Sequence, residues 1–162
     1  MLVADTQIEF LSTTDHSGTD NINLTGNNYD QAVIGNNGAN VLRGGGGIDQ
    51  LVGFGGNDIL IADSDDLVYE EVGGGYDNVF ALESLVLTAG AAVEILSTTN
   101  HGGTADINLT GNEFGQVVIG NNGANVLRGG GGIDQLVGFG GNDILIADSD
   151  DLVYEEVGGG YD

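Results

Sequence analysis

Aliphatic residues recur every nine positions through much of the chain, separated by polar, glycine-rich segments. From Gly35 the sequence reads GNNGANVLR, GGGGIDQLV and GFGGNDILI. The eighth position of these nonapeptides holds Leu42, Leu51 and Leu60, and the sixth holds Asn40, Asp49 and Asp58. Each nonapeptide predicts a six-residue turn followed by a three-residue strand whose middle side chain points inward.

Strands this short are not stable alone, so they must stack. Two nonapeptides make a coil of 18 residues, and stacking pairs each strand with its equivalent about 4.8 Å away. The sequence therefore predicts an all-β, parallel β-solenoid, with about nine coils and a length of about 43 Å for the whole chain. The nine-residue frame loosens after Ile61, in ADSDDLVYEE, and returns in VGGGYDNVF with Asp77 at position six.

A longer repeat contains the short one. Residues 33–77 recur unchanged at 118–162, an offset of 85, and residues 8–32 match 93–117 with ten differences. We expect one continuous β-solenoid over 1–162, with repeat unit one at 1–77 and unit two at 78–162. Segments 1–16 and 78–101 lack the nonapeptide, and we expect them to form irregular coils.

Composition narrows the function. Lys and Arg total 2 against 25 Asp and Glu, and the net charge of −23 disfavours nucleic acid and anionic membranes. The chain has no cysteine and therefore no disulfide, and no apolar run is long enough to span a membrane. The start, MLVADTQIEF, lacks the basic and apolar regions of a Sec signal peptide. Hydrophobic residues make up 40%, which argues against disorder and for carboxylates neutralised by cations.

Calcium is the cation that this pattern favours. One row of aliphatic side chains per sheet is a thin core, which hardly offsets the entropy of ordering 31 glycines. Calcium takes six to eight oxygen ligands from carboxylates and carbonyls. Stacking brings together position-six residues one coil apart, such as Asn40 with Asp58 and Asn125 with Asp143. Asp49 is expected to face an acidic cluster formed by Asp63, Asp65 and Asp66. We therefore expect folding to depend on several calcium ions.

The segment GGGGIDQLVGFGGNDILI resembles the RTX, or hemolysin-type calcium-binding, nonapeptide GGxGxDxUx. The resemblance covers residues 26–61 and 111–146 well and residues 62–80 loosely. It implies a right-handed parallel β-roll with calcium in the turns. It also implies a secreted or cell-surface bacterial protein exported by type I secretion. The family's C-terminal secretion region is not recognisable, so that route is inferred for a parent chain.

In that family, turn positions one, three and six supply the ligands. Carried over, they are Gly44, Gly46, Asp49, Gly53, Gly55 and Asp58, and in unit two Gly129, Gly131, Asp134, Gly138, Gly140 and Asp143. The predicted metal-site set also includes Gly35, Asn37, Asn40, Gly120, Asn122, Asn125, Asp63, Asp65, Asp66, Asp77, Asp148, Asp150 and Asp151. Asn40 and Asn125 replace aspartate, and Gln31 and Gln116 are longer, so sites that use these four are expected to be weak or empty.

Other motifs point less clearly to a function. GFGGND has Asp58 where a dinucleotide fingerprint needs glycine, and DSDD lacks the glycine and glutamate of an EF-hand. His16 and Ser12 are conceivable as a catalytic dyad, but a polar turn histidine is the favoured interpretation, as for His101. Arg43 and Arg128 are expected to pair with a turn carboxylate or to face solvent. The turn asparagines Asn36, Asn37, Asn121 and Asn122 are explained by the left-handed conformation that asparagine tolerates.

The sequence thus predicts a calcium-binding structural module rather than an enzyme. We expect it to fold and stiffen in extracellular calcium as part of an adhesin-like or other secreted protein. The alternative is a self-assembling subunit that stacks end to end into a filament through an uncapped end at Asp162. Ice or sugar binding by a turn face also stays open.

Overall fold

The computed structural model describes residues 2–3, 5–156 and 160, and the repeats of the sequence set its strands. The strands are β1 (Phe10–Ser12), β2 (Leu24–Thr25), β3 (Ala32–Ile34), β4 (Val41–Arg43), β5 (Gln50–Val52), β6 (Ile59–Ala62), β7 (Leu67–Tyr69), β8 (Asn78–Ala81), β9 (Leu85–Val86), β10 (Ile95–Thr98), β11 (Leu109–Thr110), β12 (Val117–Ile119), β13 (Val126–Arg128), β14 (Gln135–Val137), β15 (Ile144–Ile146) and β16 (Leu152–Tyr154). In the nonapeptides they cover positions seven to nine, as the pattern predicts.

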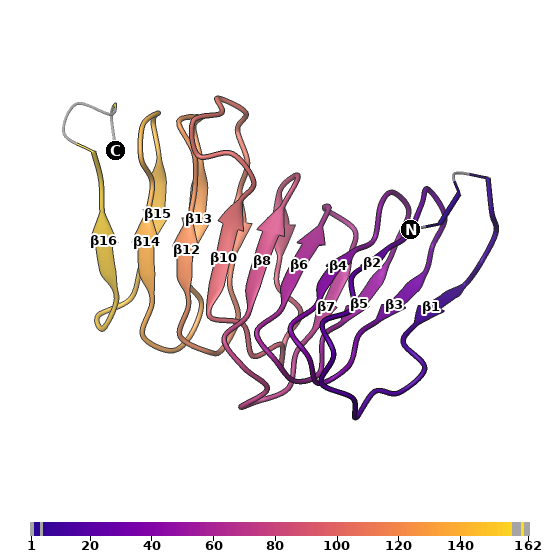
Figure 1. Ribbon diagram of the computed structural model, residues 1–162. Coiled ribbons are helices and arrows are strands. Elements are labelled where there is room, and N and C mark those ends of the chain that lie inside the picture. The colour runs from indigo at the N-terminus through magenta and orange to yellow at the C-terminus, as the bar shows by residue number, and fades with distance from the viewer. Residues whose placement is uncertain (1, 4, 157–159, 161–162) are drawn as a thin grey trace.

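The described strands form three parallel sheets, in which each strand pairs with the one two further along the chain, except that β7 does not pair with β9. The even-numbered strands β2 to β16 make one eight-stranded sheet. The odd-numbered strands make two four-stranded sheets, β1-β3-β5-β7 and β9-β11-β13-β15. The chain winds between them as a β-solenoid, seen as a row of coils in Figure 1. The predicted all-β parallel solenoid is confirmed, and no helix that could cross a membrane occurs among the described residues.

The number of coils is smaller than expected. Within the described residues, sixteen strands at two per coil give about eight coils, whereas nine were expected for the whole chain. Most paired residues lie 17 to 19 positions apart, but Phe10 pairs with Ala32 and Leu85 with Leu109. These longer coils hold extended turns, such as the loop of residues 99–108 between β10 and β11, and they account for the missing coil.

The core is a double row of aliphatic side chains between the sheets. The middle residues of the strands, Val33, Leu42, Leu51, Leu60, Val79, Leu96, Leu109, Val118, Leu127 and Leu136, are all fully buried. Burying one such side chain contributes about 1.5–3 kcal/mol. The inward orientation predicted for position eight is confirmed at these strands.

The two units place identical sequences on opposite faces. β4 belongs to the eight-stranded sheet, whereas its copy β13, 85 residues later, belongs to a four-stranded sheet. The copies are nine strands apart, which is an odd number of half-coils. Each turn of unit one therefore lies on the opposite edge from its copy.

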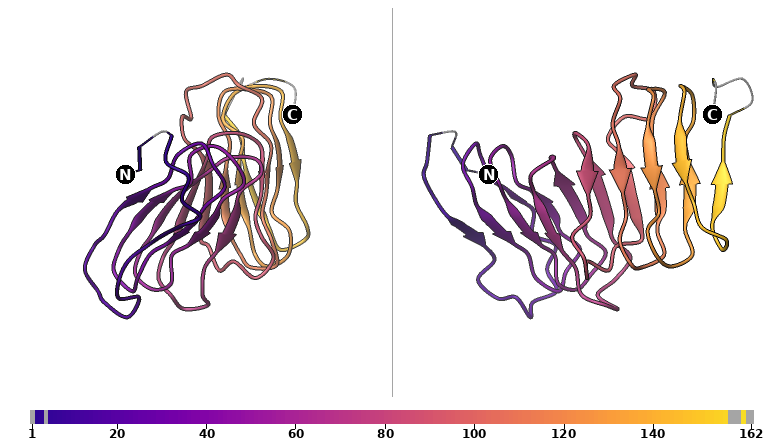
Figure 2. Two further views of the ribbon diagram at one scale, coloured as in Figure 1. Left: turned by 90° about the vertical axis from the view of Figure 1, so that its right-hand side faces the viewer. Right: turned by 180° about the vertical axis from the view of Figure 1, so that it is seen from behind.

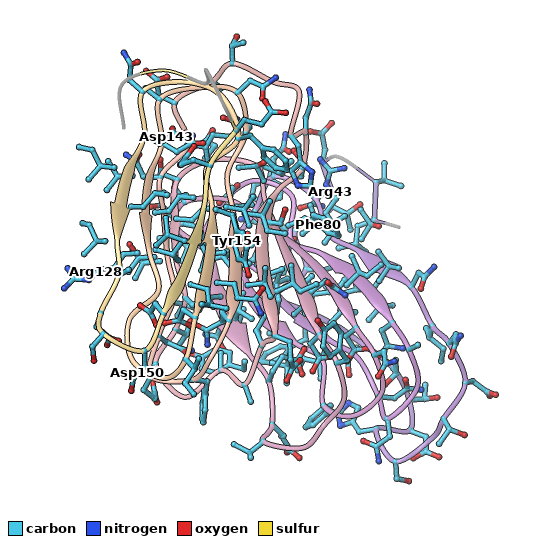
Figure 3. All side chains as sticks on the ribbon, turned by 90° about the vertical axis from the view of Figure 1, so that its left-hand side faces the viewer. Arg43, Phe80, Arg128, Asp143, Asp150 and Tyr154 are labelled. Atoms are coloured by element: carbon cyan, nitrogen blue, oxygen red, sulfur yellow. The ribbon has the colours of Figure 1, made fainter. Side chains whose placement is uncertain are left out.

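Following the chain, some turns lead out of the eight-stranded sheet, and we call the side of the solenoid on which they lie the first edge. The other turns lead back into that sheet, and they lie on the second edge. The turn of residues 138–143 lies on the first edge, and residues 147–151 lie on the second. Figure 3 shows Asp143 and Asp150 at opposite ends of the sheets accordingly. The left view of Figure 2 looks along the solenoid and shows the coils one behind another, each displaced from the one before, with the turns at the ends of the coils.

Candidate metal centre

Position-six side chains form a ladder along the second edge. Oδ1 of Asp58 accepts a hydrogen bond from the backbone N–H of Asn40, at 2.7 Å. Oδ1 of Asp77 accepts one from the N–H of Asp58 at 2.8 Å, and Oε2 of Glu94 one from the N–H of Asp77 at 2.6 Å. Each carboxylate thus commits one oxygen to the preceding coil and leaves the other for a different partner.

The first edge carries the same arrangement in unit one. Oδ1 of Asp49 accepts from the N–H of Gln31 at 2.6 Å, and Oδ1 of Asp66 from the N–H of Asp49 at 2.9 Å. The copies repeat this on the second edge, where Asp134 bonds to Gln116 and Asp151 to Asp134. The structure therefore brings together Asp49 and Asp66, although they are 17 residues apart and the nine-residue frame is broken between them.

The second oxygen of these carboxylates is buried without a hydrogen-bond partner. This holds for Oδ2 of Asp49, Asp58, Asp77 and Asp134, and for both carboxylate oxygens of Glu70. A buried charge without a partner is very unfavourable, so such groups are normally paired or bound to a metal. The two arginines of the chain, Arg43 and Arg128, are exposed, and Figure 3 shows Arg128 pointing away from the coils. Neutralisation by an external cation fits this arrangement.

Three of these carboxylates converge on the second edge. One oxygen from each of Asp58, Glu70 and Asp77 lies within 4.8 Å of the other two, and all three side chains are buried. We call this group the three-carboxylate cluster. Within the part of the chain that the structure describes, no other group of three potential metal-ligating side chains lies this close together.

Glu70 was missed in the sequence because it lies where the frame loosens. β7 pairs with β5 at an offset of 17, so that Tyr69 lies beside Val52. Glu70 then stands over Gly53, at turn position one, which is glycine in the regular nonapeptides. A Cβ on Gly53 would collide with the carboxylates of Glu70 and Asp58. Aligning LVYE with QLVG would have placed Glu70 at this position.

Burial sets the protonation of the cluster in the metal-free protein. Desolvation, with the charges of Asp77 and Asp58 adding to it, raises the pKa of Glu70 to about 9. Desolvation raises the pKa of Asp77 to about 6, against the hydrogen bond from Asp58. It also raises the pKa of Asp49 to about 6. Without a cation, Glu70 is therefore protonated at neutral pH, whereas Asp49 and Asp77 ionise as the pH rises through about 6.

The remaining acidic residues of the predicted set lie at the periphery. Asp63 is half-buried and its N–H bonds to Oδ2 of Asp66 at 3.0 Å, whereas Asp65 is exposed. Their copies Asp148 and Asp150 are both exposed. In unit two, Asp143 and Glu155 both approach Gly138 as Asp58 and Glu70 approach Gly53. The copy of Asp77 is Asp162, which lies outside the described residues, as does the predicted stacking end at that residue.

The glycines of the carboxylate turns give the backbone an unusual path. Positions two and four have positive φ: Gly45 and Gly47, Phe54 and Gly56, Gly130 and Gly132, Phe139 and Gly141. Between them lie the position-three residues predicted as ligands, Gly46, Gly55, Gly131 and Gly140. When residues with positive and negative φ alternate along a turn, successive backbone N–H groups point to one side and the carbonyl groups to the other. Such a turn can offer carbonyl oxygens together, as a calcium site needs.

The turns with an amide at position six differ. Asn40 and Asn125 are buried and lie 18 residues from Asp58 and Asp143, whose Oδ1 atoms accept from their backbone N–H groups. Both side chains donate to the position-two asparagine of their own turn, and that of Asn125 also donates to the carbonyl of Ile107 in the preceding coil at 2.9 Å. The other predicted ligands of these turns are Gly35 and Gly120, which are buried, and Asn37 and Asn122, which are exposed.

The left-handed conformation expected for the turn asparagines was wrong. Among the described non-glycine residues, positive φ occurs at Phe54 (73°) and Phe139 (71°). The asparagines at turn position two, Asn36 and Asn121, instead stay in the ordinary region and use their side chains as hydrogen-bonding groups.

Ser12 and His16 do lie together, with Oγ and Nε2 2.7 Å apart. The copies Ser97 and His101 are 2.8 Å apart. Each histidine packs on the phenylalanine with positive φ, His16 on Phe54 with ring centroids 5.2 Å apart. This contact joins turns that are two coils apart, since β3 lies between β1 and β5, and it suits a turn histidine.

The donor set consists of carboxylate and carbonyl oxygens, which are the ligands that calcium prefers. The unpartnered oxygens show where such an ion fits. A family model described as the RTX calcium-binding nonapeptide repeat (4 copies) matches residues 34–66 and 119–151. The chain matches none of the curated proteins and none of the solved structures with which it was compared. The chain is therefore a β-solenoid that carries RTX calcium-binding nonapeptide repeats at residues 34–66 and 119–151, and these repeats support a calcium-binding repeat module.

Proposed function

We propose that the chain is a structural module that folds and stiffens when calcium joins its successive coils. The observation that carries this proposal is the three-carboxylate cluster. Both carboxylate oxygens of Glu70, and one oxygen each of Asp58 and Asp77, are buried without a hydrogen-bond partner. Bound calcium would supply the positive charge that the sequence does not. Because the carboxylates come from successive coils, neutralising them ties those coils together.

The proposed ligands follow the geometry of the edges. The carboxylates are those of Asp49, Asp58, Asp66, Glu70, Asp77, Asp134, Asp143 and Asp151, with carbonyls from Gly44, Gly46, Gly53, Gly55, Gly129, Gly131, Gly138 and Gly140. The exposed residues Asp65, Asp148 and Asp150 are expected to attract calcium to the edges rather than to hold it.

An extracellular setting suits this chemistry. RTX repeats are typical of secreted bacterial proteins. A chain with a charge of −23 repels itself while calcium is scarce, and it gains its stabilising ions where calcium is abundant. Export by type I secretion, followed by folding outside the cell, is therefore part of the proposal. Within a larger adhesin-like protein, the module would act as a calcium-stiffened spacer.

Isothermal titration calorimetry tests the proposal. Wild-type chain is titrated with calcium and, as a control, with magnesium at the same ionic strength. We expect saturable calcium binding, and loss of at least one site in Asp58→Asn. Magnesium, which demands smaller octahedral sites, should bind more weakly. Equal stoichiometry in Asp58→Asn and wild type would contradict the assignment of the second-edge site.

A further inference from the structure

In the part of the chain that the structure describes, four turns are closed by a pair of side-chain amides. In the turn 35–40, the side-chain N–H of Asn40 donates to Oδ1 of Asn36 at 2.9 Å. In return, the backbone N–H of Asn36 donates to Oδ1 of Asn40 at 2.8 Å. In the turn 26–31, Asn27 and Gln31 make the same two bonds, at 2.9 and 3.0 Å. We call this arrangement between positions two and six the amide lock.

The second unit repeats the amide lock in both corresponding turns. Asn125 donates to Asn121 at 3.0 Å, and Gln116 donates to Asn112 at 2.9 Å. The backbone N–H of position two again donates back to the position-six side chain, at 2.8 Å for Asn121 and 3.1 Å for Asn112. The pair therefore persists although position six alternates between Asn and Gln and although the copies lie on opposite edges.

The carboxylate turns differ from the locked turns at both positions. Where position six is Asp49 or Asp58, position two is Gly45 or Phe54 with a φ of 121° or 73°. One oxygen of each aspartate is then left buried without a hydrogen bond. In a locked turn, position two is an asparagine outside the positive-φ region, and the side-chain oxygen of position six is satisfied by its N–H. Turn conformation and hydrogen bonding thus change together.

We propose that the amide lock makes a turn metal-free and that the residue pair at positions two and six decides which turns bind calcium. In a locked turn, the side-chain N–H of position six donates to the side-chain oxygen of position two. The partial positive charge of this N–H stabilises a turn oxygen, as a bound cation would stabilise a carboxylate. The amide at position six also carries no charge to attract an ion. This inference rests on the proposed calcium function and adds to it the rule that selects the sites.

The locked turns also have a place in the order of the coils. In each unit, two locked turns precede the two regular carboxylate turns. Asp49 stacks on Gln31, and Asp58 stacks on Asn40, through the position-six ladder. A coil that needs no ion therefore supports the first coil that does.

A gain-of-site variant tests the inference in the full chain. Asn36→Gly combined with Asn40→Asp converts the turn 35–40 to the carboxylate type, directly below Asp58. Calcium stoichiometry is measured by calorimetry, with circular dichroism in saturating calcium as the check of folding. We expect one calcium ion more than in wild type, and the same gain for Asn121→Gly with Asn125→Asp. A folded double variant with unchanged stoichiometry would overturn the inference.

Single variants separate the two positions. Asn40→Asp alone keeps Asn36, and we expect its added site to bind at least tenfold more weakly than that of the double variant. Equal affinity would refute a role for position two. Asn36→Ala is expected to leave the number of ions unchanged, and loss of an ion would show that the wild-type locked turn already binds calcium.

Asp58→Asn distinguishes failure of this inference from failure of the proposed function. If Asp58→Asn loses an ion while the lock variants gain none, the calcium function stands and the selection rule is wrong. If Asp58→Asn loses none, the proposed second-edge site itself is wrong.

Discussion

The backbone N–H of Asp58 donates a hydrogen bond of 2.8 Å to Oδ1 of Asp77, its counterpart in the next coil. This bond fixes two acidic side chains one above the other on the second edge, and Glu70 lies beside both. The hydrogen bond sets the stacking register, and the remaining oxygens generate a local negative charge. Structure and charge at this edge are therefore coupled, which leads to the following predictions.

Removing the charge of Glu70 should weaken calcium binding while the fold is retained. Glu70→Gln keeps the size of the side chain but removes one of three clustered carboxylates, and affinity at that site should fall by about tenfold or more, since it follows the charge of the ligands. Calorimetry measures the loss. The matched control is Glu71→Gln, because Glu71 is adjacent and exposed. An equal loss in both variants would show a general charge effect instead of a ligand role.

Acid should stabilise the calcium-free protein. The pKa of Glu70 is about 9 in the folded chain against an ordinary value of 4.5, so the folded state binds more protons between these pH values. Its contribution is favourable below about pH 4.5 and is lost as pH rises towards 9. Asp49 and Asp77, with pKa values of about 6, act in the same direction at lower pH.

Far-ultraviolet circular dichroism in chelator measures this effect through the β content of the calcium-free chain. The β signal should rise as the pH is lowered from 7.5 to 5, and Glu70→Gln should reduce this rise. In saturating calcium the thermal unfolding midpoint should instead fall on acidification, because protons then compete with the ion. A β signal in chelator that falls on acidification would contradict the protonation assigned to Glu70.

Filling the space above Gly53 should disrupt the cluster. The Cβ of Gly53→Ala would collide with the carboxylates of Glu70 and Asp58, which must then move apart. We expect loss of the second-edge calcium site in calorimetry, and a lower unfolding midpoint in calcium. Gly102→Ala is the control, because the nearest atom to its Cβ, in Asn100, lies 3.6 Å away. If Gly53→Ala binds like wild type, the packing of Glu70 against Gly53 is wrong.

Truncating a buried side chain in a central strand should destabilise the core. Leu60 is fully buried, and Leu60→Ala should lower the free energy of unfolding in calcium by about 2–5 kcal/mol, through lost burial and a cavity. Ile48→Ala, at a position 56% exposed, should change it far less. Denaturant titration in saturating calcium measures both. Similar losses would mean that the double row of aliphatic residues is not the main core.

Much of this architecture could be predicted because the period of nine is strict where it occurs. Leu42, Leu51 and Leu60 share a position in the repeat and are all buried, so the pattern alone predicts strands and core. The stacking of Asn40 on Asp58 follows from the same period. Glu70 could not be placed in this way, because a coil of 17 residues shifts the frame by one and moves a glutamate to a glycine position.

The hydrogen-bonding role of position two was equally hidden. Asn36 is a common turn residue, and its sequence context does not distinguish a backbone preference from a side-chain bond to Asn40. Only the three-dimensional arrangement shows the reciprocal amides. The sequence also did not predict that the turns of the two units lie on opposite edges. This result requires the number of half-coils per unit, which is odd and which the extended turns conceal in the sequence.

A calcium titration followed by far-ultraviolet circular dichroism tests the central claim most directly. The full chain is held at pH 7.5 in excess chelator, and calcium is then added past saturation. We predict a largely unfolded spectrum at the start and a saturable, cooperative change to a β spectrum, which chelator reverses. A complete β spectrum in chelator that calcium leaves unchanged would contradict the account.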